Sequence, residues 1–244
     1  MTVDALLHSQ EIDHSLPIAP QVYSYLRVRI VDNRLPPGAQ ISEASLADTL
    51  NISRTPLRAA LQKLASEGLV NTRPHVGSTV AKLDVAQLQE AVFIRAALET
   101  AVVRRLAGMN ADLSSLDPIM EIQERTARRD DYAAFFVQDE AFHGELSRIA
   151  GVSRTWKLAL SIKGHVDRQR YLLMAGIAGR SQRAYEEHIE IINEIRSGDA
   201  DGAARAMHDH VNSVLELDER GQGIIPPGNA GPDGERQNQP KGVS

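Results

Sequence analysis

The sequence predicts a mainly α-helical protein in two parts, an N-terminal winged helix-turn-helix and a C-terminal antiparallel bundle of helices. Residues 41–69 contain two short amphipathic segments separated by a turn, and two strand-like segments follow them. From residue 84 to about residue 219, apolar residues recur three and four positions apart with short breaks. This spacing is typical of helices that pack through one face. A chain of 244 residues is long enough for two such domains.

The segment 41–69 is predicted to form a helix, a tight turn and a second helix. Leu46 and Leu50 lie on one face of the first helix. Asn51 is expected to end that helix, because asparagine tolerates the left-handed backbone found at helix C-termini. Ser53 is expected to cap the second helix, since a hydroxyl oxygen can accept a hydrogen bond from a backbone N–H of the first turn.

The outward face of the second helix carries residues that suit DNA. Leu57, Leu61 and Leu64 form its buried face, which leaves a polar set toward solvent: Ser53, Arg54, Thr55 and Arg58. Hydroxyl groups and a helix N-terminus can bind phosphates, and guanidinium groups can reach N7 and O6 of guanine in the major groove. Such helix pairs also occur in proteins that never bind DNA, so this pair alone leaves a solvated surface helix as the alternative.

A two-stranded wing is predicted after the second helix. Residues that favour strands flank a turn at 74–77: Val70, Thr72, Thr79 and Val80. The tip of the hairpin would present Arg73, His75 and the backbone of Gly77. A small loop of this kind can enter the minor groove of DNA.

These motifs resemble those of GntR-family transcription regulators. The resemblance covers residues 20–83 and lies in LPPGAQISEASLA at 35–47, NISRTPLRAAL at 51–61 and EGLV at 67–70. It implies a winged helix-turn-helix domain that binds DNA. The chain departs from the pattern at Ala44, where many relatives carry a basic residue.

Composition limits the class of protein. The chain has no cysteine, which excludes disulfides and cysteine-based zinc sites. No apolar run approaches the roughly 20 residues of a membrane span, and no signal sequence is evident, so we expect a cytoplasmic protein without membrane contact. The formal net charge of −5 argues against a protein that coats nucleic acid, but not against a regulator with a locally basic recognition helix.

Four segments are predicted along the chain. Residues 1–19 form an N-terminal arm, 20–83 the winged helix-turn-helix domain, 84–219 the helical domain, and 220–244 a disordered tail rich in glycine, proline and polar residues. Helix periods and stop signals place six helices in the helical domain: 84–108, 112–128, 131–149, 153–175, 179–197 and 199–218.

Four polar residues occupy core positions of these helices. Asp139 and His143 lie four residues apart on one apolar face, and His188 and His210 lie in register with two other apolar faces. Burying them is costly unless they are paired, and one divalent ion can satisfy all four. Imidazole with carboxylate suits zinc or nickel better than calcium. A single histidine on an apolar face is more often a hydrogen-bonded core residue, and this alternative stays open unless the helices bring the four together.

The helical part resembles the FCD ligand-binding domain of the FadR-like branch of the same family. The resemblance lies in IRAALETAVVRRLA at 94–107, DEAFHGELSRIAG at 139–151 and EHIEIINEIRSGDADGAARAMHDHV at 187–211. In the metal-binding members of that branch, one aspartate and three histidines hold one ion. Those places fall here on Asp139, His143, His188 and His210. The resemblance therefore implies one divalent metal ion per chain.

Arg95 is the candidate residue for binding an effector. It lies on the inner face of its predicted helix, and a buried guanidinium needs an anion. That anion is either an internal carboxylate such as Glu99 or the carboxylate of a small ligand, held by a two-point contact. The resemblance favours the effector role. His165 could line the same cavity or be a core histidine.

These features together predict a ligand-responsive transcription regulator, expected to be a repressor. It would act as a homodimer on palindromic operator DNA and sense a small carboxylate effector. The alternative is a metal-dependent hydrolase or decarboxylase that acts on a small carboxylic acid. No general base is evident beside the four polar residues, and a DNA-binding domain has no purpose in an enzyme of that kind. A third reading is a regulator that senses the metal ion itself.

Overall fold

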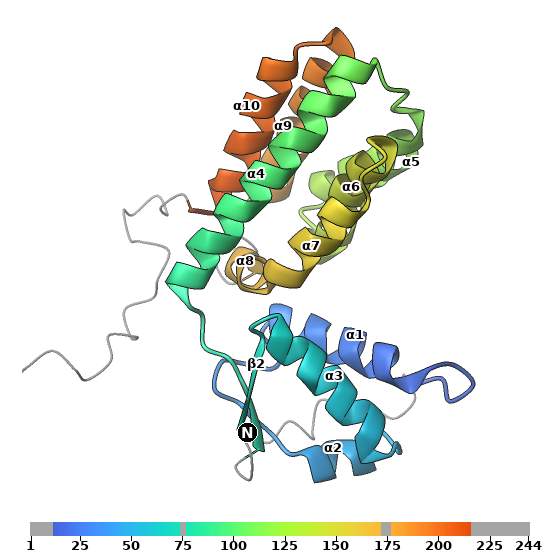
Figure 1. Ribbon diagram of the computed structural model, residues 1–244, viewed down its shortest axis with the longest axis vertical. Coiled ribbons are helices and arrows are strands. Elements are labelled where there is room, and N and C mark those ends of the chain that lie inside the picture. Colours follow the sequence, from blue (N-terminus) through green and yellow to red (C-terminus); the bar gives the residue numbers. More distant parts are fainter. Residues whose placement is uncertain (1–11, 74–76, 172–176, 216–244) are drawn as a thin grey trace, which may run out of the picture.

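The computed structural model describes residues 12–73, 77–171 and 177–215. Figure 1 shows these residues as two bodies, one above the other along the long axis of the molecule. The predicted disordered tail, residues 1–11 of the predicted arm, and His75 lie outside the described residues.

The N-terminal body is a winged helix-turn-helix. It contains, in chain order, α1 (Ile18–Val31), β1 (Gln40–Ile41), α2 (Glu43–Thr49), α3 (Arg54–Ser66), β2 (Val70–Arg73) and β3 (Gly77–Val80). The strands form an antiparallel sheet in the order β1-β3-β2, with Val70 opposite Val80 and Gln40 opposite Thr79. The sequence predicts only the two strands of the wing, and the two-residue β1 is an additional third strand.

The turn between α2 and α3 forms as the sequence predicts, with one exception. Asn51 adopts a left-handed backbone with a φ of 51°, and Leu57, Leu61 and Leu64 are buried on the inner face of α3. Ser53 stands at the N-cap position of α3, but its side chain accepts no capping hydrogen bond. The expected side-chain cap is therefore wrong, and the Ser53 hydroxyl lies exposed to solvent.

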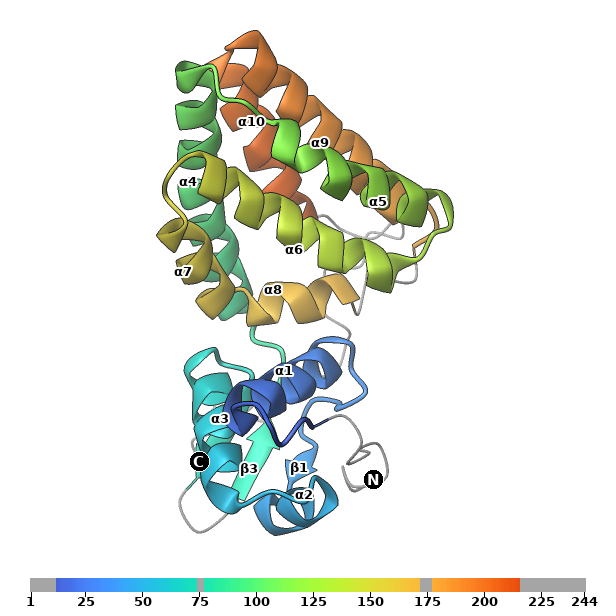
Figure 2. The same cartoon turned by 90° about the vertical axis from the view of Figure 1, so that its right-hand side faces the viewer.

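The C-terminal body is a bundle of helices with a large apolar core and a smaller apolar cluster of Ala127, Phe135 and Ala184. Its helices are α4 (Val85–Met109), α5 (Asp117–Arg128), α6 (Tyr132–Ile149), α7 (Arg154–Ile162), α8 (Gly164–Gln169), α9 (Arg180–Ser197) and α10 (Ala200–Asn212). Two short 3₁₀ helices, Ser114–Leu116 and Ser213–Leu215, precede α5 and follow α10. Figure 2 shows α4, α9 and α10 beside one another, with α6 crossing the bundle and α8 at the end that faces the N-terminal body.

The prediction of one continuous helix over 153–175 is wrong. The structure instead has α7, a break at Lys163, and the short helix α8. The break lies where the chain meets the N-terminal body, and a Cβ atom on Gly164 would lie 2.8 Å from side-chain atoms of Leu69. Periodicity within the segment carries no information about this contact. Within the described residues, no helix is long and apolar enough to cross a membrane.

Candidate metal centre and DNA-binding face

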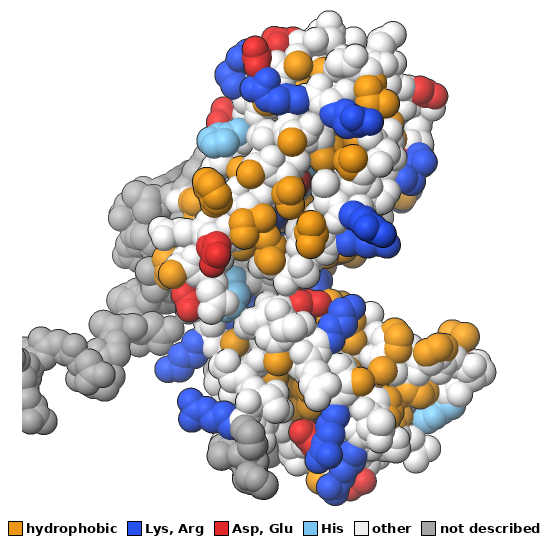
Figure 3. Space-filling model, in the orientation of Figure 1, with side chains coloured by type: hydrophobic (Ala, Val, Ile, Leu, Met, Phe, Trp, Pro, Cys, Tyr) orange, Lys and Arg blue, Asp and Glu red, His pale blue; other side chains and the backbone are white. Residues whose placement is uncertain are grey.

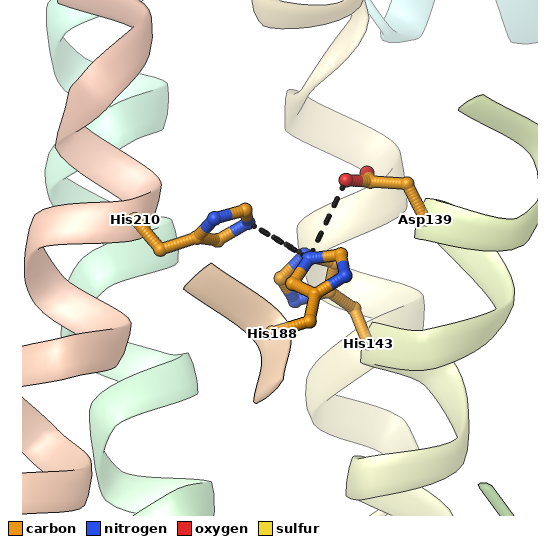
Figure 4. A group of neighbouring side chains, drawn as sticks. All are labelled: Asp139, His143, His188 and His210. Carbon is orange, nitrogen blue, oxygen red and sulfur yellow. Dashed lines mark hydrogen bonds and ion pairs between the residues drawn. The ribbon is translucent and has the colours of Figure 1, made fainter. Parts of the chain in front are cut away.

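The four polar residues predicted from the sequence come together inside the helical bundle. Asp139 and His143 project from α6, His188 from α9 and His210 from α10. All four are buried, and one ligand atom from each lies within 4.8 Å of the others. Figure 4 shows the four side chains directed toward one another.

Two of the histidines are held through Nδ1 by buried or half-buried carboxylates. His143 Nδ1 lies 2.5 Å from Glu99 Oε2, and His210 Nδ1 lies 2.7 Å from Glu187 Oε2. Burial raises the pKa of the Glu99 carboxyl, but the Arg95 guanidinium and His143 outweigh burial and hold that pKa below its usual value. Burial also raises the pKa of Glu187, and the contact with His210 outweighs it. Both carboxylates are therefore ionised, and each can accept from the Nδ1 of the histidine beside it.

The third histidine is held in the same way by an amide. His188 Nδ1 lies 2.8 Å from Gln123 Oε1. Gln123 Nε2 donates to the backbone oxygen of Gln138 at 3.0 Å, which fixes the orientation of the amide group. Burial holds the pKa of His188 well below its usual value, and the neighbouring His210 lowers it further. His188 is therefore a neutral imidazole with its proton on Nδ1.

The remaining ring nitrogens of the three histidines face one another. His210 Nε2 lies 3.3 Å from His188 Nε2 and 3.3 Å from His143 Nε2, and His188 Nε2 lies 3.6 Å from Asp139 Oδ1. If all three protons are on Nδ1, none of these atoms can donate a hydrogen bond to another; a ring with its proton on Nε2 would instead bond to its neighbour at 3.3 Å. Three imidazole nitrogens and a carboxylate directed at one point are a donor set that could hold a cation. The donor set, three imidazole nitrogens and one carboxylate, fits a borderline divalent ion such as zinc or nickel.

Arg170 is a contact of this centre that the sequence reasoning missed. Its guanidinium donates to Asp139 Oδ2 at 2.6 Å and to Asp139 Oδ1 at 2.8 Å. Burial raises the pKa of Asp139, but Arg170 outweighs burial and holds that pKa well below its usual value. An ionised carboxylate has about four lone-pair positions, so it can accept from Arg170 and still contact a cation.

Three buried guanidiniums lie around a small cavity next to His210. The cavity has a volume of about 10 Å³, and its walls include Arg95, Arg170, Arg180 and Ser213. This volume is room for no more than about one water molecule. Arg95 Nε lies 2.7 Å from Glu99 Oε1, so the internal carboxylate considered from the sequence is present. Arg180 donates to the Ser213 hydroxyl at 2.6 Å.

His165 does not lie beside Arg95. It projects from α8 toward the N-terminal body, where its Nδ1 lies 3.4 Å from the backbone nitrogen of Asp84. It lines a separate pocket of about 180 Å³, which also contains Gly68 and Glu90. The structure therefore does not bring the two predicted effector residues into one cavity.

The predicted DNA-binding residues of α3 form an exposed set. Ser53, Arg54, Thr55 and Arg58 are all exposed at the start of the helix. Arg58 Nε contacts Glu43 Oε2 of α2 at 2.7 Å. In the wing, Arg73 pairs with Gly77 at the end of the β2–β3 ladder, and both are exposed. Figure 3 shows basic side chains at the lower end of the molecule, on the N-terminal body.

Sequence reasoning found the four residues of the buried cluster but not most of the residues that hold them. Glu99 entered only as a partner for Arg95, and Gln123, Arg170, Arg180 and Glu187 were not singled out. The feature of the sequence that could have identified Gln123 is its position as a polar residue on the inward face of an amphipathic helix. Glu187 directly precedes His188 in the chain, and only the three-dimensional packing brings it to His210.

Comparisons with known proteins agree with this architecture. The family "Bacterial regulatory proteins, gntR family" matches residues 18–80, and the FCD domain family matches residues 90–213. The HTH-type transcriptional repressor RspR of Escherichia coli (strain K12) is 33% identical over 218 residues, which are 88% of this chain and 93% of that protein. The gluconate operon transcriptional repressor of Bacillus licheniformis is 27% identical over 198 residues, 78% of this chain and 80% of that protein.

A solved structure shows the same fold. The structure described as E. coli McbR/YncC has a TM-score of 0.68 at 21% identity and covers 80% of this chain and 93% of its own. The matching families and relatives are transcription regulators and not enzymes, so the hydrolase or decarboxylase alternative is set aside. The chain belongs to the GntR family of bacterial transcription regulators and carries an FCD domain after its winged helix-turn-helix.

Proposed function

We propose that this chain is a ligand-responsive transcriptional repressor whose helical domain binds one divalent metal ion and a small carboxylate effector. The winged domain over 20–83 would bind the operator, and the helical domain over 84–219 would sense the ligand. The observation that carries the metal part is the direction of three imidazoles, each held through Nδ1 so that its Nε2 faces Asp139 and the other two rings. Repression is supported by relatives that are themselves named repressors.

Zinc or nickel is the ion that the ligand atoms favour. Asp139, His143, His188 and His210 would hold it, and the bound ion would supply positive charge and a coordination position for a carboxylate oxygen. A surface groove of about 550 Å³ between α9 and α10 borders this place, because His210 forms part of its wall. Glu186, Glu190 and Glu194 also line that groove and would attract a cation.

The charges around the centre favour an anionic effector. Three guanidiniums, of Arg95, Arg170 and Arg180, are matched by three carboxylates, of Glu99, Asp139 and Glu187. A divalent ion would add two positive charges to this balanced set, and one or two ligand carboxylates would compensate them. The cavity beside His210 is small, so side chains such as Arg95 would move when the effector binds. The effector proposal rests on Arg95 and the metal centre, and no longer on His165.

The arrangement of α4 and α7 supports a homodimer. Phe93 on α4 is 74% exposed and Leu158 on α7 is 59% exposed. Ala97 and Ala101 continue the exposed face of α4 at four-residue spacing. Figure 3 shows apolar side chains gathered on this face of the bundle. A second copy packed here would present two winged domains to the two half-sites of a palindromic operator.

Operator affinity tests the DNA part of the proposal. Arg54→Ala or Arg58→Ala should each weaken specific binding by about 1–3 kcal/mol, because each removes a guanidinium that can contact a base edge. Both should keep their melting temperature, since both side chains are exposed. Arg128→Ala, which removes an exposed arginine of α5, is the matched control. Operator affinity that is unchanged in both α3 variants would contradict the assignment of α3 as the reading helix.

The same assay tests the effector part. With metal-loaded protein, operator affinity is titrated with small mono- and dicarboxylates. Arg95→Lys should reduce the response to the active acid while leaving effector-free DNA binding unchanged, because an ammonium group cannot make the two-point contact. A variant that responds at wild-type effector concentrations would show that Arg95 serves only to hold Glu99.

A further inference from the structure

A pocket of about 180 Å³ lies where the two bodies meet, away from the four clustered residues. Its walls come from the turn after α3, the N-terminal part of α4 and the corner between α7 and α8. Figure 1 shows the lower end of α4 and this corner above the end of α3 that leads into β2. The volume is below the range of about 300–1,000 Å³ that is typical of sites for drug-sized ligands. The pocket therefore suits a molecule of few non-hydrogen atoms.

One wall of this pocket carries a buried imidazole with an unused donor. His165 is 2% exposed, and its Nδ1 accepts from the backbone N–H of Asp84 at 3.4 Å. Burial and the charge of Arg168 outweigh the opposite effects of Asp84 and the Gly68 backbone and hold the pKa of His165 below its usual value. The ring is therefore neutral, with its proton on Nε2. Within the described residues, this Nε2–H has no hydrogen-bond partner, and an acceptor atom of a ligand would remove that cost.

An acceptor atom lies across a small gap from this donor. Gln87 Nε2 donates to Asp84 Oδ2 at 3.1 Å, which identifies Gln87 Oε1 as the acceptor atom of the amide group. A Cβ atom on Gly68 would lie 2.9 Å from Gln87 Oε1 and 3.0 Å from His165 Nε2, so these two atoms flank the same gap. Gly68 has a φ of 72°, which favours glycine. The absence of a side chain at this position keeps the gap open.

The charged side chains that line the pocket are carboxylates. Glu90 is exposed and forms no ion pair within the part of the chain that the structure describes. Glu67 also lines the pocket, and its carboxylate accepts from the Tyr23 hydroxyl at 2.7 Å. Arg168 is not part of the wall, and its Nη1 donates to the backbone oxygen of Ala81 at 2.7 Å. This lining disfavours an anionic ligand and favours a cation.

We propose that this pocket binds a small organic cation that carries an ammonium group and one acceptor oxygen, such as a short amino alcohol. The ammonium group contacts Glu90 and Gln87 Oε1, and the oxygen accepts from His165 Nε2. The carbon chain between them packs on Ile94 and Ile162, which form apolar parts of the wall. A bare metal ion does not fit, because the N–H of His165 points its proton toward the ligand. The site is separate from the proposed metal centre and carboxylate effector and requires neither of them.

The test is a titration of metal-stripped, isotope-labelled full-length protein with matched pairs of ligands, followed by nuclear magnetic resonance at constant pH. Aminopropanol and butylamine have equal charge and equal numbers of non-hydrogen atoms, but only aminopropanol has an acceptor oxygen. Ethanolamine and propylamine form a shorter pair of the same kind, and butyrate is the anionic control. The signals followed are the backbone amides of Gly68 and Glu90 and the ring nitrogens of His165.

The amino alcohols should shift these signals and bind about 10-fold more tightly than the matched amines, because only they satisfy the buried N–H of His165. Butyrate should leave the signals unchanged. Glu90→Gln should weaken binding of the amino alcohols by about 2- to 5-fold, as expected for loss of an exposed ion pair. Glu121→Gln, which removes an exposed carboxylate of α5, is the matched control and should bind as wild type does.

Two substitutions of His165 test the donor itself. His165→Leu removes the N–H and should make the two members of each pair bind equally, whereas His165→Gln keeps an N–H donor and should retain part of the preference. The comparison of matched ligands on wild-type protein needs no variant, so it decides the question even if His165→Leu does not fold. The proposal is overturned if amino alcohols leave the Gly68 and His165 signals unmoved, if wild type binds both members of each pair equally, or if butyrate shifts the same signals.

Discussion

Gln123→Leu tests whether the residues behind the histidines contribute to the metal centre. Gln123 is fully buried on α5, accepts from His188 Nδ1 at 2.8 Å and donates to Gln138 O at 3.0 Å. Leucine has a similar volume but offers neither bond. Without metal, the unpaired buried N–H of His188 should lower the free energy of unfolding by about 1–3 kcal/mol. With metal, loss of the group that holds a ligating histidine should lower affinity by about 10- to 100-fold.

These values translate into a difference in melting temperature. At zinc equal to about 100 times the wild-type dissociation constant, binding adds about 2.7 kcal/mol to wild-type stability. A variant with 10- to 100-fold weaker binding gains only about 0.4–1.4 kcal/mol at the same concentration. At about 2–4 °C per kcal/mol for a chain of this size, the zinc-induced shift should fall from about 5–11 °C to about 1–6 °C.

Differential scanning fluorimetry with and without zinc measures both effects. Gln182→Leu, which removes a glutamine that contacts Glu186 away from the histidines, is the matched control and should keep the full zinc-induced shift. A Gln123→Leu protein with the wild-type shift would refute the reasoning, because it would show that His188 keeps its orientation without the amide.

Two further predictions concern a residue near the centre and a residue of α8. Trp156, the one tryptophan in the chain, stacks on His143 with ring centroids 5.5 Å apart, so nickel should quench its fluorescence in proportion to bound ion. His143→Ala should abolish this response, and a nickel titration that saturates without any change in emission would contradict the site. Arg168→Met should raise the melting temperature, because Arg168 of α8 is buried, its Nε and Nη2 have no hydrogen-bond partner among the described residues, and a buried charge without a counter-ion costs free energy. Calorimetry checks this against the exposed control Arg128→Met, and a clear fall in melting temperature would mean that the Ala81 hydrogen bond outweighs the buried charge.

The exposed face of α3 and the inward positions of the four clustered residues could be predicted because both depend on local periodicity. Leu57, Leu61 and Leu64 define the buried face of α3, which leaves Arg54 and Arg58 exposed. The inward register of His188 and His210 was likewise visible in their own helices, and both are buried. Periodicity shows which way a side chain faces within its helix. Whether four helical positions converge depends on packing, which only the fold reveals.

The parts that sequence reasoning missed depend on contacts between distant segments. The break before Gly164 lies where Gly164 packs on Leu69, and β1 consists of Gln40 and Ile41, which pair with β3. Gln123 is 65 residues from His188 in the chain. No local pattern distinguishes such an inward glutamine from one that only joins two helices.

The most direct test of the account is a calorimetric zinc titration of metal-stripped protein. The account predicts one ion per chain for wild type and a large loss of affinity for His210→Ala. The matched control is His208→Ala, which removes an exposed histidine two positions away on α10 and should bind zinc as wild type does. Wild-type protein that takes up no ion, or equal binding by the two alanine variants, would contradict the claim that Asp139, His143, His188 and His210 form a metal centre.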